Sequence, residues 1–321
     1  MNQSHDSAVA DQGQEPVVRV ERLTIAYGAR TAVSEVSFTV AAGQIVGLVG
    51  PNGAGKTSVA ETVGGIRDAV AGGSVSVCGL DPLRDRAAVR SLIGMQLQES
   101  SFPSRTKVGE LCDLYEAIYH APAAADGLLA SYGLADRRRS FISSLSGGMR
   151  QRLALVLAQI GAVRLVILDE LTTGLDPEQR RGTWRSVREL AERGVAVLLT
   201  SHYMDEVEAL CSKVVVLREG RTVAYDSPAR ITVQHGGPAT FTVDVGRDGA
   251  AREKLDRLGL RRVAAPAPTR EGTAVLTGSF PEDYNRIIEA VSAVGLPPSA
   301  VTHRAPTFED AYLGLVAAQE E

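Results

Sequence analysis

The sequence predicts an α/β fold in which helices flank a mostly parallel sheet. Short apolar runs bounded by glycine or polar residues recur at Leu165–Leu168, Val195–Leu199 and Val214–Leu217, which is typical of buried parallel strands. Helical segments at Pro177–Glu192 and Met204–Leu210 separate these runs. The order of elements is therefore that of successive β-α-β units, and a smaller α+β pattern follows from residue 230 onward.

Length and composition limit the possible classes of protein. A chain of 321 residues suits one large domain plus a smaller one. The net charge of −4 gives no broad positive field, so binding to nucleic acid is not indicated. Cys78, Cys112 and Cys211 form no close pair, which argues against a disulfide framework or zinc site and fits a reduced, cytosolic setting. No run of about 18 uninterrupted apolar residues exists, so no membrane helix is expected.

Three regions are expected along the chain. Residues 1–16 lack the basic start and apolar core of a signal peptide, and their polar composition predicts a disordered tail. Residues 17–229 form the α/β domain, and residues 230–321 form a separate α+β domain, because the composition changes at Ser227-Pro228 and again at His235–Pro238.

The remaining elements follow from local patterns. In the first domain, further strands are expected at Val17–Ile25, Val36–Val40, Gln44–Val49, Ser74–Cys78 and Leu92–Leu97, and helices within Val108–Tyr132 and from Ser146. In the second domain, strands are expected at Thr240–Val245 and Ala274–Thr277, and helices at Ala250–Leu258, Asp283–Val294 and Thr307–Ala317. The last helix places Phe308, Tyr312, Leu315 and Val316 on one face, which we expect to pack within its own domain.

The most informative motif follows the strand at Gln44–Val49. It reads Gly50-Pro51-Asn52-Gly53-Ala54-Gly55-Lys56-Thr57 and continues into Ser58, matching the P-loop pattern. The glycines allow backbone N–H groups to converge on an anion, and the following helix N-terminus also favours negative charge. Lys56 supplies a positive charge for the β- and γ-phosphates, and the Thr57 hydroxyl can ligate Mg²⁺. The segment predicts nucleotide binding.

Two acidic residues end the buried strand at Leu165–Leu168. Asp169 can hold Mg²⁺ through water, and Glu170 is placed to polarise an attacking water. Upstream, Ser146 is a good helix N-cap, and Gly147 and Gly148 allow close backbone approach to an anion. Together with the P-loop, these residues predict catalysis on a nucleotide.

In their order and spacing, these segments resemble the ABC-transporter ATPases over residues 17 to 229. Leu145-Ser146-Gly147-Gly148-Met149 is similar to the LSGGQ signature of that family. The resemblance implies a P-loop core with a helical subdomain inserted at about residues 99–160, and ATP and Mg²⁺ as cofactors. Two positions depart from the pattern: Met149 replaces glutamine and Leu171 replaces proline, but neither removes a group that the chemistry needs.

The resemblance also assigns roles residue by residue. Tyr27 matches the aromatic residue that stacks on adenine, and His202 matches the histidine that contacts the γ-phosphate. Gln98 matches the glutamine that senses Mg²⁺ and the membrane partner. Asp176, at the end of Thr173–Asp176, belongs to the loop that crosses the dimer interface. The implied catalytic set is Glu170, His202 and Gln98, and the implied Mg²⁺ ligands are Thr57, Gln98 and Asp169.

A finer resemblance places the chain in a branch of this family. Ile93–Glu99, Ser201–Glu206 and Ala305–Leu313 are similar to the antibiotic- and daunorubicin-resistance exporter ATPases. The resemblance implies a homodimer in which Lys56 of one subunit and Ser146 and Gly148 of the other grip each ATP. It also implies a peripheral position on the cytoplasmic side of the cell membrane, where a separate permease contacts residues 98–120. The cargo could be a drug-like molecule, a lipid or another small molecule.

Three alternatives stay open at this point. An importer ATPase is disfavoured by the C-terminal segment Ala305–Leu313. A soluble, non-transport ABC ATPase acting on ribosomes or DNA is disfavoured because such relatives carry two ATPase halves or a long coiled coil, and neither occurs here. A sensor that binds ATP without hydrolysis is disfavoured by Glu170 and His202, which are both present.

Overall fold

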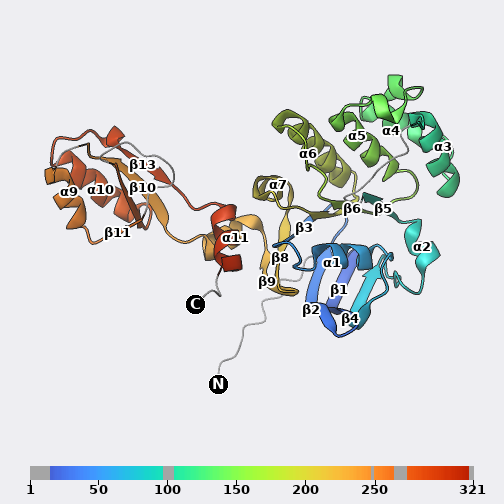
Figure 1. Cartoon of the computed structure of the whole chain (residues 1–321), viewed down its shortest axis with the longest axis horizontal. Helices are drawn as coiled ribbons and strands as arrows, with labels where there is room; N and C mark the ends of the chain where they lie inside the picture. Colours follow the sequence, from blue (N-terminus) through green and yellow to red (C-terminus); the bar gives the residue numbers. More distant parts are fainter. Residues whose placement is uncertain (1–14, 97–104, 247–248, 264–272, 318–321) are drawn as a thin grey trace. The chain divides into compact units, whose positions relative to one another are not determined.

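The computed structural model describes residues 15–96, 105–246, 249–263 and 273–317. Packing divides the chain into two compact units, the first ending at Pro228 and the second beginning at Ala229 (Figure 1). Most of the expected tail at 1–16 lies outside the described residues, as does Gln98.

A six-stranded sheet in the order β5-β6-β7-β3-β8-β9 forms the centre of the first unit (Figure 1). Its strands are β3 (Ile45–Val49), β5 (Ile93–Gln96), β6 (Leu165–Asp169), β7 (Ala196–Thr200), β8 (Lys213–Arg218) and β9 (Arg221–Asp226). All neighbours pair in parallel except β9, which is antiparallel to β8. Strands β3, β6 and β7 are buried at every residue, which explains their continuous apolar sequences.

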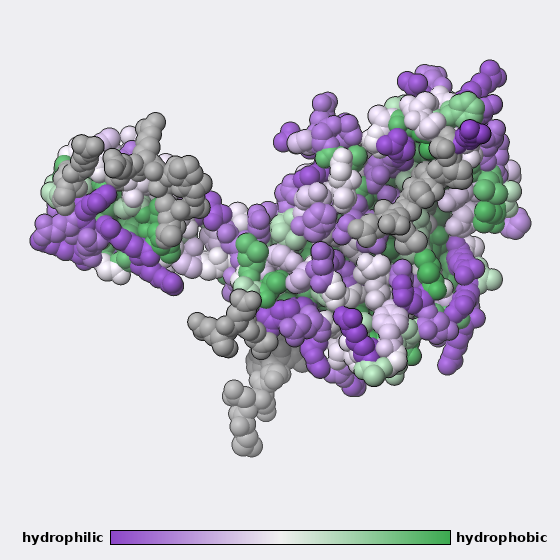
Figure 2. Space-filling view, in the orientation of Figure 1, coloured by the Kyte–Doolittle hydropathy of each residue, from purple (hydrophilic) through white to green (hydrophobic). Residues whose placement is uncertain are grey.

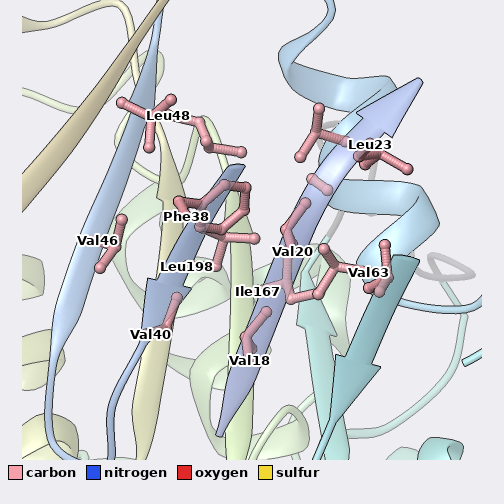
Figure 3. Close-up of a cluster of buried hydrophobic side chains, with 14 of the residues drawn as sticks. Val18, Val20, Leu23, Phe38, Val40, Val46, Leu48, Val63, Ile167 and Leu198 are labelled. Carbon is pink, nitrogen blue, oxygen red and sulfur yellow. The ribbon is translucent and has the colours of Figure 1, made fainter. Parts of the chain in front are cut away.

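A second sheet shares its core with the central one. Its strands β1 (Val18–Tyr27), β2 (Arg30–Val40) and β4 (Val70–Val77) pair antiparallel in the order β2-β1-β4. Figure 3 shows Val20 of β1, Phe38 of β2, Ile167 of β6 and Val63 of helix α1 (Lys56–Val63) in one buried apolar cluster. This cluster fixes α1, and with it the P-loop that precedes the helix.

Further helices connect the strands of the first unit. They are α2 (Arg86–Arg90), α3 (Val108–Ile118), α4 (Ala124–Ser131), α5 (Gly147–Leu157), α6 (Pro177–Glu192) and α7 (Met204–Leu210). Helices α3, α4 and α5 pack on one another, and α5 also packs on β5. A Cβ atom added to Gly94 of β5 would come within 1.7 Å of the Ala158 carbonyl oxygen at the end of α5. Because the Ser146 motif begins α5, this close approach fixes the motif relative to the sheet.

The second unit contains a β-α-β-β-α-β arrangement. Its members are β10 (Ala239–Asp244), α9 (Gly249–Asp256), β11 (Arg261–Arg262), β12 (Thr273–Gly278), α10 (Glu282–Ser292) and β13 (Val301–Arg304). The sheet order is β11-β12-β10-β13 and every pair is antiparallel, which is the ferredoxin-like pattern. Its apolar core includes Phe241, Leu276 and Ile287.

Two further helices, α8 (Pro228–His235) and α11 (Phe308–Ala317), flank this arrangement in the sequence. A Cβ atom on Gly314 of α11 would lie 3.5 Å from the His235 carbonyl oxygen, so the two helices are close. On the face expected to pack within this domain, Phe308 is fully buried, and Tyr312, Leu315 and Val316 are partly buried. Within the described ranges, no helix has both the length and the apolar composition needed to cross a membrane.

Candidate nucleotide-binding site

The P-loop connects β3 to α1 and turns tightly at Gly50. A Cβ atom at Gly50 would lie 2.2 Å from the Leu217 carbonyl oxygen, and its φ of 155° also favours glycine. The Lys56 ammonium donates to the Gly50 carbonyl over 2.7 Å and to the Pro51 carbonyl over 3.0 Å. Burial lowers the pKa of Lys56, and the charges of Glu170 and Asp169 oppose this effect. Lys56 is therefore held over the loop in reach of an anion there.

A cavity of about 590 Å³ lies over this loop. It is lined by Tyr27, Arg30, Ala32, Asn52, Gly53, Gly55, Lys56, Thr57, Ser58 and Glu170. The structure thus brings Tyr27 and Glu170 to the P-loop from β1 and β6. Arg30 and Ala32 were missed, because the sequence predicted β2 only from Val36.

Tyr27 lies at the rim of this cavity. Its hydroxyl donates to Ser58 Oγ over 3.2 Å, and the Arg67 guanidinium lies 5.4 Å from its ring centroid. Arg67 also forms an ion pair with Glu61. Tyr27 as a whole residue remains 37% exposed, which is compatible with stacking of its ring on a planar ligand.

Thr200 anchors both acidic residues at the end of β6. Its hydroxyl donates to Asp169 Oδ1 and accepts from the Glu170 N–H over 3.2 Å. Burial raises the pKa of Asp169, and the Thr200 hydrogen bond opposes this rise. Glu170 has a φ of 52°, a left-handed conformation that costs energy for a non-glycine residue. Its N–H also donates to the Thr200 carbonyl over 3.1 Å, which helps to hold this conformation.

His202 approaches Glu170 from the neighbouring strand. Strands β6 and β7 are parallel and adjacent, so the segments that follow them meet at the same edge of the sheet. His202 Nδ1 lies 3.6 Å from Glu170 Oε1, and the imidazole packs on Tyr203 with ring centroids 4.1 Å apart. The sequence-predicted histidine and glutamate are therefore brought together.

The predicted signature and interface residues lie elsewhere. Ser146 caps α5, with its hydroxyl accepting from the Met149 N–H over 3.3 Å. The donor is the backbone N–H of residue 149, so this hydrogen bond does not depend on the glutamine that is usual at this position in the family. Asp176 likewise caps α6 through the Gln179 N–H over 2.8 Å. Ser146 and Gly148 line a different cavity, beside Gln179. A single chain does not bring Ser146, Gly147, Gly148 or Asp176 to the P-loop cavity.

The residues present fit a Mg²⁺ ion bound together with nucleotide phosphates. Thr57 lines the cavity, and Asp169 is close enough for its charge to act on Lys56. Both offer the hard oxygen ligands that Mg²⁺ prefers, with phosphates and water completing the coordination. Within the described residues, no cluster of three or more His, Cys, Asp or Glu side chains could hold a metal on its own. Gln98 lies outside the described residues.

Known proteins resemble this chain in sequence. The model of the family described as ABC transporter matches residues 33–173. The daunorubicin resistance ATP-binding protein DrrA3 of Streptomyces coeruleorubidus is 33% identical, over 90% of this chain and 92% of its own length. The Nod factor export ATP-binding protein I of Ralstonia nicotianae is 30% identical, over 94% of both.

Solved structures support the predicted fold. An ATP-binding subunit of an ABC transporter is 27% identical, with a TM-score of 0.62 over 68% of this chain and 93% of that one. A nucleotide-free ATP-binding cassette is similar in fold alone, with 20% identity and a TM-score of 0.61 over 68% and 94%. The predicted α/β P-loop fold and the resemblance to resistance-exporter ATPases are confirmed. The chain therefore belongs to the ATP-binding subunits of the ABC transporter family.

Proposed function

We propose that this chain hydrolyses ATP with Mg²⁺ and drives export through a separate membrane permease. The observation that carries this proposal is the 3.6 Å approach of His202 to Glu170, where Glu170 lines the P-loop cavity. The names of the relatives, which concern daunorubicin resistance and Nod factor export, support export over import. The cargo class is a drug-like molecule, a lipid or another small molecule.

Each residue of the site has a distinct role in the proposed reaction. Lys56 and the loop N–H groups hold the β- and γ-phosphates, and Tyr27 stacks on the base. Thr57 and Asp169 and, in the resemblance, Gln98 would hold Mg²⁺, which would supply positive charge to neutralise the phosphate oxygens. Glu170 accepts a hydrogen bond from the attacking water and orients it. His202 then donates to the γ-phosphate, where negative charge must be stabilised during transfer.

Dimerisation explains why the signature lies away from the cavity. Ser146 and Gly148 belong to a separate surface with Gln179, so they reach a γ-phosphate only on a second subunit. Asp176 ends the loop that, in the resemblance, crosses the dimer interface between the two nucleotide sites. ATP then closes a homodimer head to tail, because both halves grip the γ-phosphate, and hydrolysis opens it again. Opening and closing is the motion that the permease uses.

The proposed permease contact lies on α3 and the adjoining core. Leu114 and Ile118 of α3 are 53% and 58% exposed, and Ile66 is 48% exposed. A groove beside them is lined by Ile66, Met95, Tyr115 and Tyr119, among others. Exposed apolar side chains beside a groove mark an interaction surface, and Figure 2 shows hydrophobic areas among mainly hydrophilic ones. In this proposal the subunit lies peripherally on the cytoplasmic side of the membrane and contacts it through the permease.

The deciding experiment measures ATP affinity and phosphate release by the purified protein with and without Mg²⁺. We expect hydrolysis that requires Mg²⁺ and is abolished in Lys56→Ala. Near-normal binding and turnover in Lys56→Ala would contradict the assignment, because the Lys56 ammonium is the charge that lies over the Gly50 and Pro51 carbonyls of the P-loop.

A further inference from the structure

A buried carboxylate outside the nucleotide cavity joins the segments that carry Glu170 and His202. Glu206 lies on α7 and has no exposed surface. Among the described residues, no Lys or Arg forms an ion pair with it. Its two oxygens instead accept hydrogen bonds from three neutral side chains, those of Thr172, Trp184 and Ser201.

Each donor comes from a different part of the first unit. The Thr172 hydroxyl and the Trp184 indole N–H both donate to Glu206 Oε1 over 2.9 Å. The Ser201 hydroxyl donates to Oε2 over 2.6 Å. Thr172 stands two residues after Glu170, Ser201 directly precedes His202, and Trp184 belongs to α6. One carboxylate thus ties together the segments after β6 and β7 and the helix that follows the predicted interface loop.

Packing alone does not explain a carboxylate at this position. A buried carboxylate loses its hydration, and an apolar side chain of similar volume usually fills such a space at lower cost. Hydrogen bonds to a charged acceptor are short and strong, and the Ser201 bond has the length expected for that type. A carboxylate is therefore a less stable way to fill this space than an apolar side chain would be. It can, however, hold three hydrogen-bond donors in fixed positions.

The contacts continue from these donors to the reacting groups. Ser201 Oγ also accepts from the Tyr203 N–H over 3.1 Å, so His202 lies between two residues that share one anchored hydroxyl. On the other branch, the Thr173 N–H donates to the Glu170 carbonyl over 3.2 Å, and the Leu175 N–H donates to the Thr172 carbonyl over 3.2 Å. Movement of either donor would change the spacing between His202 and Glu170.

We infer that Glu206 is a positioning residue for ATP hydrolysis, holding Ser201 and Thr172 so that His202 and Glu170 act on the same γ-phosphate. The inference rests on the function proposed above. Glu206 is not among the residues that line the P-loop cavity, so it acts on the reaction through the positions of Ser201 and Thr172. Its loss should lower kcat and leave ATP affinity unchanged.

The test begins with Glu206→Gln in the full-length protein. The amide oxygen can still accept from Thr172 and Trp184, but the amide nitrogen faces Ser201 and cannot accept its proton. We expect kcat to fall by about 10- to 10²-fold, as misplacement of catalytic groups does, with an unchanged dissociation constant for ATP. Trp184 is the only tryptophan of the chain. Its unchanged fluorescence emission would therefore show that the hydrogen bond from α6 to residue 206 remains.

Single-donor variants separate positioning from stability. Thr172→Val removes one donor at nearly constant volume, and Thr172→Ser keeps the hydroxyl as its matched control. Ser201→Ala removes the hydrogen bond between Glu206 and the residue that precedes His202. Trp184→Phe removes only the hydrogen bond between Glu206 and α6. We expect Thr172→Val and Ser201→Ala to lower kcat more than Trp184→Phe does, and Thr172→Ser to restore turnover, all without loss of ATP affinity.

The outcomes distinguish this inference from the proposed function. A wild-type protein without ATPase activity defeats the proposed function itself. An active wild type whose folded Glu206→Gln variant keeps its kcat overturns the inference alone, as does equal loss in Trp184→Phe and Ser201→Ala. If circular dichroism shows that Glu206→Gln does not fold, the Thr172→Val and Thr172→Ser pair decides: equal kcat values for the two overturn the inference.

Discussion

His202 Nδ1 lies 3.6 Å from Glu170 Oε1, although the two residues are 32 positions apart in the sequence. The approach follows from the pairing of β6 with β7, which places the two strand ends side by side. Thr200, at the end of β7, bonds both Asp169 and the Glu170 N–H. The geometry of the acidic pair and that of the histidine are therefore set by the same strand.

Glu170→Gln tests the role of this carboxylate. The amide cannot take up a proton and orients water less well, so turnover should fall by about 10²- to 10⁴-fold, whereas ATP affinity should remain. Retained ATP should also trap a closed dimer, which gel filtration or light scattering measures. Asp205→Asn serves as a control, because Asp205 is an exposed carboxylate paired with Arg180 outside the cavity. Normal hydrolysis by Glu170→Gln would show that another group activates water.

Mixed dimers test whether Ser146 acts on the nucleotide of the other subunit. Ser146→Arg should bind ATP in isolation, because Ser146 lies outside the P-loop cavity, but should not hydrolyse it. Lys56→Ala should fail to bind. In a mixture, one composite site combines Lys56 of one chain with Ser146 of the other, so phosphate release should exceed that of either parent.

The control for this experiment is a mixture in which one chain carries both substitutions and the other carries none. That dimer contains no site with both functional faces. Each mixed dimer is isolated by successive capture through different tags on its two chains, which removes wild-type homodimers. Equal activity of the two isolated mixed dimers would count against the arrangement in trans.

The close packing of α5 on β5 predicts a stability effect at Gly94. A Cβ atom there would overlap the Ala158 carbonyl oxygen, and overpacking of this kind costs about 1–3 kcal/mol or more. Gly94→Ala should therefore lower the free energy of unfolding in urea. Gly127 of α4 is the matched control: nothing lies within 4 Å of its added Cβ, and alanine in a helix gains roughly 0.5–1 kcal/mol. Similar effects at the two sites would refute the close contact.

The exposed face of α3 gives a prediction for the permease. Leu114→Glu and Ile118→Glu should reduce co-purification with the cognate permease, because a buried charge in an apolar contact is unfavourable. ATP hydrolysis by the isolated subunit should persist, since neither residue lines the nucleotide cavity. Val233→Glu, at an apolar position that is 86% exposed, controls for added charge. Undiminished permease capture by both α3 variants would exclude this face.

Much of the first unit could be predicted from sequence because its strands are buried on both faces. Leu165–Leu168 and Val195–Leu199 are apolar runs that allow few other interpretations. The edge strands of the second unit were missed for the opposite reason. β11 consists of two exposed arginines, and only Val301 of β13 is buried, so neither shows an alternating apolar pattern.

The site was predictable where a motif fixes the backbone and less so where polar groups meet through folding. The P-loop, Asp169 and Glu170 are local patterns. Thr200 and Glu206 are polar residues in the sequence, and only the pairing of β6 with β7 and the packing of α6 on α7 show that both are buried and bonded. Their bonds to Asp169, Thr172 and Trp184 join residues 22 to 34 positions apart.

Removal of the second unit gives the last prediction. A chain ending at Pro228 keeps every residue that lines the P-loop cavity, so ATP binding should persist. Dimerisation and export with the cognate permease should weaken, because the truncation removes Ala305–Leu313, the segment that resembles the exporter branch. A shorter deletion after Arg304 isolates α11, whose first turn is held by Thr307, Asp310 and Arg304 through a capping box and an ion pair. If the folded Pro228 truncation loses ATP binding, the units are not independent. If export is undiminished by both deletions, α11 and the ferredoxin-like arrangement have no part in transport.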